Sequence, residues 1–233
     1  MATKRSKRYR KSAELVDPRK EYKLVEAVKL LKSMTPAKCD QTVDLAFRLG
    51  VDPKQSDQMV RGTVALPNGS GKKVRILVFA KGQAAEAAKA AGADMVGFEE
   101  LVKKVTEGFQ DFDVAIATPE AMSEVRKLGK ILGPRGLMPN PKTGTVTDDT
   151  ASAVNACKAG RVEFKVDKAA NLHIVCGKFS FAEEKIQQNV AAVIDTVVKA
   201  RPSSAKGAFI ESCVLSATFT PGINIDTTDF SKN

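Results

Sequence analysis

The segment "GKILGPRGLMPNPKTG", from Gly129 to Gly144, combines four glycines, three prolines and three basic residues and contains no acidic residue. Prolines stiffen such a segment and remove backbone N–H donors, while glycines permit tight turns. The pattern predicts a rigid, positively charged platform from which Arg135 and Lys142 contact a phosphate backbone. The alternative, that the segment only folds its domain, stays open. The residues that define the predicted platform are Gly133, Pro134, Arg135, Gly136, Met138, Pro139, Pro141 and Lys142.

Motifs of known enzymes are absent or incomplete. A phosphate-binding loop needs the spacing GxxxxGK[ST] between a strand and a helix, whereas here prolines stand where N–H donors are required. The triplet "KTG" (142–144) and the stretch "SSAK" (203–206) resemble those of penicillin-binding acyltransferases, but their order along the chain is reversed. The only histidine, His173, lies in the apolar run "NLHIVC" and is typical of a packed strand residue, which leaves no His-based triad or metal site.

We therefore expect no enzyme, no cofactor, no metal and no small-molecule substrate. A nucleotide-using enzyme built on the central part of the chain is the alternative, and an ATP or NAD binding assay would identify it.

Composition indicates a soluble globular protein with an acidic partner. The chain has 233 residues and a net charge of +10, and nucleic acid is the commonest partner of so basic a chain. The sequence contains no run of eighteen apolar residues, so no membrane span is predicted. The basic N-terminus is not followed by the apolar stretch that a secretory signal has. Four scattered cysteines without CxxC spacing predict reduced core thiols in a cytoplasmic protein; they are Cys39, Cys157, Cys176 and Cys213.

The central segment, residues 70–160, alternates between strand and helix patterns. "KVRILVFA" predicts a buried parallel strand and "GQAAEAAKAAGA" a helix that ends at Gly92. "DMVGFEELVKKVTEG" predicts a second strand and helix. "FDVAIATPEAMSEVRKLGKIL" predicts a third pair, with Thr118 capping the helix and Pro119 in its first turn. A last helix is expected near "TASAVNACKAG". The alternation predicts a small parallel α/β domain.

The flanking segments, 1–69 and 161–233, have another pattern. "EYKLVEAVKLLKS" and "AEEKIQQNVAAVIDTVVKA" predict helices, and "QTVDLAFRLGV" alternates apolar and polar residues like a half-buried antiparallel strand. Further strands are expected at "RGTVAL", at "GAFIESCVLSATFT", and at "GRVEFKV" and "NLHIVCG", which should form a hairpin around 167–170. Together the flanks predict an α+β domain with a four-stranded antiparallel sheet. The domain 70–160 is then an insertion with two glycine-containing crossings, which favours a hinge.

Positive charge concentrates in the discontinuous domain. The net charge is +7 in residues 1–69, +2 in 70–160 and +1 in 161–233, so a polyanion should bind the discontinuous domain first. Six of the first eleven residues are Lys or Arg. Lys4, Arg5, Lys7 and Arg8 predict a flexible basic arm on phosphates, with a solubilising tail as the alternative.

Several long segments share their sequence with one protein family. "LGKILGPRGLMPNPKTGTV" matches a family signature nearly residue for residue. Other segments of the chain also match the family, in the family's order: "KRYRK", "RLGVDPKQSDQMVRGTVALPNGSGK", "AKGQAAEAAKAAGAD", "FDVAIATPE" and "KAGRVEF". The chain thereby resembles the bacterial large-subunit ribosomal protein L-one (uL-one) family. The resemblance implies a split α+β domain with an inserted Rossmann-like domain. It also implies a part of the large ribosomal subunit that binds large-subunit rRNA in the mobile side stalk, assists release of deacylated exit-site tRNA, and in many bacterial members represses its own operon mRNA.

The resemblance also assigns candidate rRNA-binding residues by motif. They are Lys38, Asp40 and Thr42 in "AKCDQT", Lys165, Asp167 and Lys168 in "EFKVDK", and Ser212 and Thr218 in the last strand. The residue types suit RNA because Lys neutralises phosphate, while Ser and Thr hydroxyls reach 2′-OH groups and base edges in a shallow minor groove. A solvated strand end is the alternative for each residue.

Two motifs depart from the family pattern. Cys39 stands where the family usually has an aromatic residue, which removes a stacking contact. Thr218-Phe219-Thr220-Pro221 replaces Thr-Met-Gly-Pro, so Thr220 adds a Cβ where glycine permits close approach to RNA, and Phe219 offers an apolar contact. A general DNA-binding protein is a third function class. Competition between RNA and DNA separates it, because only RNA carries the 2′-OH.

Overall fold

The chain forms two compact units. The structure, a computed structural model, describes residues 5–228, so Lys4 of the predicted arm lies outside the described residues. Unit 1 contains Met1–Gly71 and Val162–Asn233, and unit 2 contains Lys72–Arg161. Each unit has its own hydrophobic core. Within residues 5–228, no helix is long and apolar enough to cross a membrane.

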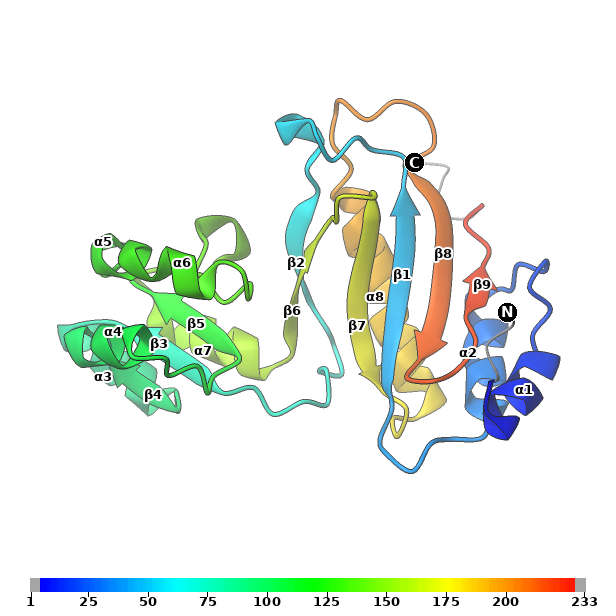
Figure 1. The fold of residues 1–233 in the computed structure, drawn as a ribbon, viewed down its shortest axis with the longest axis horizontal. Coiled ribbons are helices and arrows are strands. Elements are labelled where there is room, and N and C mark those ends of the chain that lie inside the picture. Colours follow the sequence, from blue (N-terminus) through cyan, green and yellow to red (C-terminus); the bar gives the residue numbers. More distant parts are fainter. Residues whose placement is uncertain (1–4, 229–233) are drawn as a thin grey trace. The chain divides into compact units, whose positions relative to one another are not determined.

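Unit 1 combines helices with an antiparallel sheet. Its elements are, in chain order, α1 (Lys7–Glu14), α2 (Leu24–Ser33), β1 (Thr42–Leu49), η1 (Ser56–Gln58), β2 (Arg61–Ala65), β6 (Arg161–Lys165), β7 (Asn171–Lys178), α8 (Glu183–Lys199), β8 (Ile210–Ala217) and β9 (Ile223–Ile225). Four of the strands form one antiparallel sheet in the order β7-β1-β8-β9 (Figure 1). The expected α+β architecture with a four-stranded antiparallel sheet is therefore confirmed.

Alternation along β1 decides which face of this sheet is buried. Val43, Leu45, Phe47 and Leu49 are at most 2% exposed and belong to the same core as the apolar residues of α2 and α8. Burial of each such side chain contributes roughly 1.5–3 kcal/mol. Figure 1 shows α8 lying along one side of the sheet. The residues between the buried ones face the other way and supply the polar surface described below.

Strand pairing in unit 1 differs from the expectation in two places. The strand at "RGTVAL", β2, pairs with β6 in a separate two-stranded sheet, and the fourth strand of the main sheet is the unexpected β9. The chain does turn at 167–170, but β6 and β7 belong to different sheets, so the expected hairpin was wrong. The reason is local packing: the ring of Phe164 lies 2.8 Å from where a Cβ on Gly62 would stand, so β6 is fixed on β2 by a contact that only glycine permits.

The expected flexible arm is a helix from Lys7 onward. The Ser6 hydroxyl accepts a hydrogen bond from the backbone N–H of Tyr9 at 3.2 Å, which caps the first turn of α1. Arg5 precedes this cap, and Lys7 and Arg8 lie in the first turn. The expectation of a flexible arm was therefore wrong for Lys7 and Arg8, because the serine cap outweighs mutual repulsion of the basic side chains. Arg5 lies outside the helix, and for it the expectation stays a prediction.

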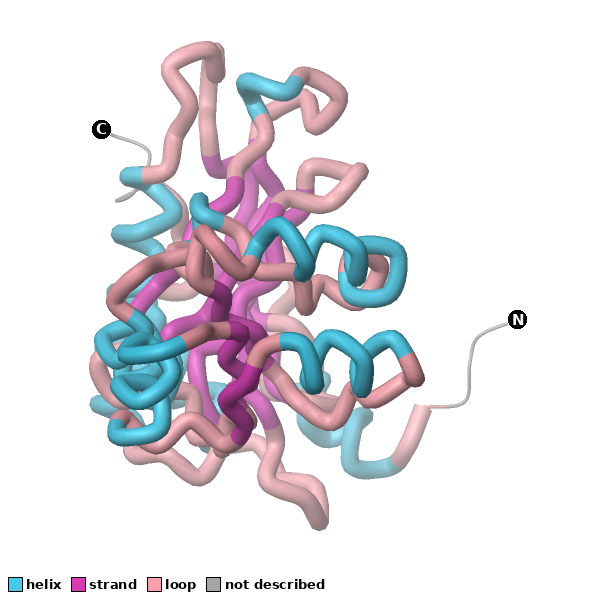
Figure 2. The backbone as a smooth tube through the Cα atoms, turned by 90° about the vertical axis from the view of Figure 1, so that its left-hand side faces the viewer, coloured by secondary structure: helices cyan, strands magenta, loops and turns pink. Residues whose placement is uncertain are grey.

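Unit 2 is a parallel α/β structure. Its elements are, in chain order, β3 (Ile76–Phe79), α3 (Gly82–Ala90), β4 (Met95–Gly97), α4 (Glu99–Thr106), β5 (Val114–Ala117), α5 (Met122–Val125), η2 (Arg126–Leu128), α6 (Gly129–Leu132), η3 (Pro141–Thr143) and α7 (Thr150–Lys158). The strands pair parallel in the order β4-β3-β5. One face packs on α3 and α7 and the other on α4 to α6, and Figure 2 shows helices on both sides of the strands. The expected α/β architecture is confirmed.

The helix expected after β5 is broken into three short pieces. The Thr118 hydroxyl accepts a hydrogen bond from the N–H of Ala121 at 3.4 Å, so it caps a turn that precedes α5. The 3-10 turn η2 then interrupts the helix. Val125 and Leu128 are both buried and stand three residues apart, the spacing at which side chains of a 3-10 turn share a direction.

Candidate nucleic-acid interface

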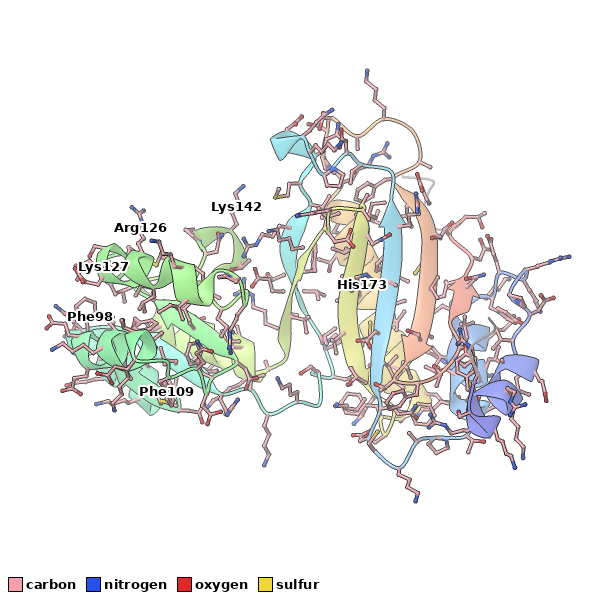
Figure 3. The ribbon with its side chains drawn as sticks, in the orientation of Figure 1. Phe98, Phe109, Arg126, Lys127, Lys142 and His173 are labelled. Atoms are coloured by element: carbon pink, nitrogen blue, oxygen red, sulfur yellow. The ribbon has the colours of Figure 1, made fainter. Side chains whose placement is uncertain are left out.

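The face of the main sheet opposite the core carries polar side chains and charges of both signs, with half-buried Ala46, Val175 and Val214 between them. We call it the open face; it includes Asp44, Arg48, His173, Ser212 and Ser216, all half-buried or exposed. Arg48 stands opposite Ser212 on β8, and Asp44 stands opposite Ser216. The expectation that His173 is packed was wrong: its neighbours along β7 point into the core, so His173 is exposed on the open face (Figure 3).

The eight candidate rRNA-binding residues gather at the two ends of β1. Arg48 lies six positions after Thr42, which corresponds to about 20 Å along a strand. The group at the Thr42 end comprises Lys38, Asp40, Thr42 and Thr218. The group at the Arg48 end comprises Lys165, Asp167, Lys168 and Ser212, because the 167–170 turn adjoins the end of β1 through the hydrogen bond from Leu49 N–H to the Ala170 carbonyl at 2.9 Å.

Hydrogen bonds between strands fix the hydroxyl groups at the Thr42 end. The backbone N–H of Thr42 donates to the Thr218 hydroxyl at 3.1 Å, and the N–H of Thr218 donates to the Thr42 carbonyl at 3.0 Å. The ammonium of Lys178 donates to the Thr42 hydroxyl at 3.0 Å. Lys178 was not among the predicted residues, although its place opposite Thr42 follows once β1 and β7 are paired. Two hydroxyls and one ammonium group therefore share a fixed geometry.

The loop before β1 is held by its carboxylate. Asp40 accepts hydrogen bonds from the backbone N–H of Ser180 at 3.2 Å and from its hydroxyl at 3.0 Å. This contact ties the loop to the segment after β7 and leaves Lys38 and Cys39 exposed. The expectation of a core thiol was wrong for Cys39, which lies between two polar residues of the loop; the other three cysteines are buried.

The departure at "TFTP" produces an exposed aromatic ring. Phe219 is 67% exposed and adopts a φ of 65° in the turn after β8. Such a conformation is unusual for a bulky residue, and this kind of strain gathers at functional sites. Thr220 does not adopt it; its hydroxyl accepts a hydrogen bond from the Ala217 N–H at 2.9 Å and so closes the turn. The Thr220 hydroxyl thus stabilises the turn that presents Phe219.

Helix α1 brings cations to this ring. The guanidinium of Arg8 lies 5.8 Å from the centroid of the Phe219 ring, and that of Arg5 lies 4.3 Å from the Tyr9 ring. Together with Ser6, these four residues line a shallow hollow of about 380 Å³. Sequence reasoning named Arg5, Arg8 and Phe219 but not the contact between Arg8 and Phe219, because that contact depends on α1 packing near the β8–β9 turn.

The Arg48 end is organised around one carboxylate. Asp167 accepts hydrogen bonds from the backbone N–H groups of Asn171 at 2.7 Å and Ala169 at 2.8 Å, and these bonds, the one from Asn171 first, lower the pKa of Asp167. The carboxylate therefore stays ionised and shapes the turn. Lys165 and Lys168 are exposed on either side of it.

The signature segment of unit 2, residues Gly129 to Gly144, has a fixed backbone and exposed charges. The side-chain oxygen of Asn140 accepts a hydrogen bond from the Lys142 N–H at 2.8 Å. The backbone carbonyl oxygen of Asn140 accepts a hydrogen bond from the Thr143 hydroxyl at 3.1 Å. Pro139 is buried and Met138 half-buried against the core, whereas the other predicted platform residues are exposed, namely Gly133, Pro134, Arg135, Gly136, Pro141 and Lys142. Figure 3 shows Lys142 and Arg126 projecting outward on the same side of unit 2. Arg126 was not predicted.

Glycine is required at position 133 of this segment for steric reasons. A Cβ on Gly133 would stand 2.5 Å from the carbonyl oxygen of Gly129, which is closer than real Cβ atoms approach. A Cβ on Gly129 itself would meet nothing within 4 Å. The close approach at Gly133 lets the chain turn directly out of α6 into the exposed part of the segment.

Comparison with known proteins matches the architecture and motifs described above. Residues 31–221 match the Ribosomal protein L1p/L10e family. The large ribosomal subunit protein uL1 of Clavibacter michiganensis subsp. michiganensis is 55% identical over 222 residues, 95% of this chain and 97% of that protein. The protein of the same name from Thermobifida fusca is 54% identical over 223 residues, 96% of this chain and 95% of that protein. The one from Beutenbergia cavernae is 55% identical over 224 residues, 96% of this chain and 94% of that protein.

These names describe ribosomal proteins rather than enzymes, so the expected non-enzymatic role is confirmed. With a family match over most of the chain and relatives more than half identical along nearly all of it, the chain belongs to the Ribosomal protein L1p/L10e family.

Proposed function

We propose that this chain is a cytoplasmic, structural constituent of the large ribosomal subunit and binds large-subunit rRNA through unit 1. The observation that carries the proposal is the Thr42 end, where fixed hydroxyls of Thr42 and Thr218 lie beside Lys178 and next to exposed Phe219. Hydroxyls suit 2′-OH groups, ammonium suits phosphate, and an exposed ring suits an unstacked base. Relatives named as large ribosomal subunit proteins support the assignment.

Each candidate residue has a role that its environment permits. Exposed Lys38, Lys165 and Lys168 neutralise phosphates, as do Arg5, Lys7 and Arg8 of the N-terminal segment. Ser212, Thr42 and Thr218 contact 2′-OH groups. Asp40 and Asp167 act mainly by holding the loops that carry the lysines, through the hydrogen bonds described above.

A titration tests the proposal. The purified chain is titrated against large-subunit rRNA fragments at low and high salt, with duplex DNA as competitor. We expect one fragment to remain bound at high salt and to resist DNA. Binding that collapses with salt and yields to DNA would mean that charge alone acts, and would favour a general DNA-binding protein. Binding of ATP or NAD in a parallel assay would favour a nucleotide-using enzyme.

We also propose that unit 2 contacts exit-site tRNA and assists its release. Exposed Arg135 and Lys142 on the fixed backbone of the signature segment support this role. Ribosomes carrying Arg135→Ala with Lys142→Ala should release deacylated tRNA more slowly. Lys89→Ala, which removes one exposed charge from α3, is the control. Unchanged ribosome binding and unchanged tRNA release in the double variant would refute the contact.

The same surface of unit 1 is proposed to bind the chain's own operon mRNA and repress its translation. One surface cannot hold two RNAs at once, so an rRNA fragment should displace the mRNA leader in proportion to its affinity. Simultaneous binding of both RNAs, or no binding of the leader, would contradict this part of the proposal.

The two units are proposed to be separate domains, 1–69 with 161–233 and 70–160. Their separate cores support this division. A variant in which a flexible Gly/Ser linker replaces residues 72–161 should fold and keep its rRNA affinity at high salt within about threefold, because the net charge is concentrated in unit 1 and the effect of the charges of unit 2 falls as salt rises. An unfolded variant would contradict separate domains, and a folded one that no longer binds would contradict the location of the site.

A further inference from the structure

Unit 2 contains a hollow of about 540 Å³ at the carboxyl ends of its parallel strands. Its walls come from the residues that follow β3, β4 and β5, namely Lys81, Phe98 with the start of α4, and the segment from Thr118 to Glu124. The chain leaves β3 toward α3 on one face of the sheet and leaves the neighbouring β5 toward α5 on the other. Open α/β sheets bind their ligands at such a reversal, in hollows of this size.

An ammonium group already occupies the aromatic wall of the hollow. The Nζ atom of Lys81 lies 3.9 Å from the centroid of the Phe98 ring and 3.6 Å from a carboxylate oxygen of Glu99. Both charged side chains are more than 60% exposed. Such a contact is weak and exchanges readily, so another cation of better shape can take its place.

The charge of the hollow is opposite to that of the chain. Three glutamates, Glu99, Glu120 and Glu124, line it against two lysines, Lys81 and Lys103, whereas the chain as a whole carries +10. Glu124 pairs with Lys127 at 2.6 Å, outside the lining, which leaves Glu99 and Glu120 to repel the phosphates of a nucleotide. A guanidinium group suits the lining instead, because it is planar, stacks on aromatic rings and donates forked hydrogen bonds to carboxylates.

We propose that this hollow binds an arginine side chain from a basic segment of a partner protein. The guanidinium replaces the Lys81 ammonium on the Phe98 ring and pairs with Glu99 and Glu120. This site involves no RNA contact, so the proposal can be tested independently of the proposed rRNA binding.

The test uses the full-length chain labelled with ¹⁵N. It is titrated with the peptide acetyl-Gly-Arg-Gly-amide and, separately, with the same peptide carrying citrulline, a neutral isostere of arginine. We expect saturable shifts of backbone amides confined to the hollow with the arginine peptide, and none with citrulline. Equal shifts with citrulline, or shifts scattered over the surface, would overturn the proposal. Stronger shifts of the same amides with AMP would overturn it in favour of a nucleotide site.

Matched variants sharpen the test. Lys81→Met removes the internal competitor and should tighten binding of the arginine peptide about two- to fivefold, the contribution of an exposed cation–π contact. Lys89→Met removes the same charge elsewhere and should change binding less than twofold. Glu120→Gln should weaken binding, and Glu86→Gln, which alters an exposed side chain of α3, should not. Equal effects of the two lysine variants, or of the two glutamate variants, would show that only long-range charge acts.

Phe98→Leu removes the ring while keeping an apolar side chain. It should abolish saturable binding, and its amide spectrum outside the hollow should match that of the unaltered chain. Retained binding in this folded variant would refute the stacking geometry.

Discussion

At the Thr42 end of unit 1 the candidate RNA contacts are side chains fixed by the sheet, whereas in the signature segment of unit 2 they are charges projecting from a fixed backbone. Thr42 and Thr218 exchange hydrogen bonds across strands, and Lys178 is held on the Thr42 hydroxyl. Arg135 and Lys142 are exposed and form no ion pair within the described residues. Hydrogen bonds therefore fix side chains in the first region and the backbone in the second.

This difference has consequences for recognition. Hydroxyls held in place distinguish RNA from DNA and depend little on salt, because they form directional hydrogen bonds with 2′-OH groups. Lysine and arginine on a platform attract any phosphate backbone, and their effect falls as salt rises. Unit 1 is therefore expected to provide specificity and the signature segment to provide steering.

The largest effect is expected from removing the fixed hydroxyls. Thr42→Val with Thr218→Val should lower rRNA affinity about 10- to 100-fold, since each missing hydrogen bond costs about 0.5–1.5 kcal/mol or more where a partner stays unsatisfied. Filter binding at high salt measures it. The matched variant Thr42→Ser with Thr218→Ser keeps both hydroxyls and should bind within about threefold of the unaltered chain. Equal losses of affinity in the two variants would mean that methyl packing, and not the hydroxyls, supports binding.

Periodicity was enough to predict the layers of both units. In β1 the alternation of Val43, Leu45 and Phe47 with polar residues fixed the buried face, and the buried run of β3 indicated a parallel strand covered on both sides. These signals are local, and burial enforces them. The same holds for Thr42 at the start of β1, whereas Thr218, expected in the last strand, lies in the turn just after β8.

Contacts between distant segments could not be predicted in this way. Lys178 reaches Thr42 only because β7 pairs with β1, and Arg8 reaches Phe219 only because α1 packs near the β8–β9 turn. The pairing of β2 with β6 depends on the absence of a Cβ at Gly62, which no periodicity reveals. Tertiary packing selected these partners among many that local sequence allows.

The second largest effect concerns the backbone of the signature segment. Gly133→Ala should lower the free energy of unfolding of unit 2 by about 2 kcal/mol, because its Cβ collides with a carbonyl oxygen that cannot move freely. Gly129→Ala, with open space around its Cβ, should be neutral or stabilise by up to about 1 kcal/mol. Urea unfolding of both variants measures this. Equal stability of the two would show that the segment is less rigid than its hydrogen bonds indicate.

A smaller effect should separate steering from specificity. Arg135→Ala with Lys142→Ala should weaken RNA binding at low salt by about tenfold at most and little at high salt. The slope of log affinity against log salt should become shallower by up to about 1.8, which is about 0.9 for each phosphate that the variant no longer neutralises. Affinities measured at four salt concentrations give the slope. An unchanged slope would exclude these two residues from RNA binding, and a weakening that persists at high salt would assign them a directional role instead.

The smallest effects are expected from pH, and they should have opposite signs in the two units. On the open face, burial raises the pKa of Asp44 above its usual 3.8, against weaker attraction from His173 and Lys178. The folded state therefore binds this proton more tightly than the unfolded state, so the contribution of Asp44 to the free energy of unfolding falls as pH rises from about 3.8 through the raised pKa. In unit 2, hydrogen bonds from Lys72 and then Arg75 lower the pKa of Asp113 to about 2. Its contribution is complete above 3.8 and is lost as pH falls toward 2.

Two substitutions convert this difference into a measurement. Asp44→Asn should raise the free energy of unfolding at pH 7 and Asp113→Asn should lower it, each by at most about 1 kcal/mol because solvent screens partly exposed charges. Urea unfolding at pH 3, 5 and 7 measures both, and Asp195→Asn, which alters an exposed side chain of α8, is the control for loss of one charge. Because Asp44 also repels phosphate, its substitution should strengthen rRNA binding about two- to threefold, which is the attraction expected of one screened charge. A shift of stability in the same direction in both variants would mean that paired cations hold the carboxylates of the open face, as they hold those of unit 2. The distinction between a surface shaped by the sheet and one shaped by charge would then no longer hold.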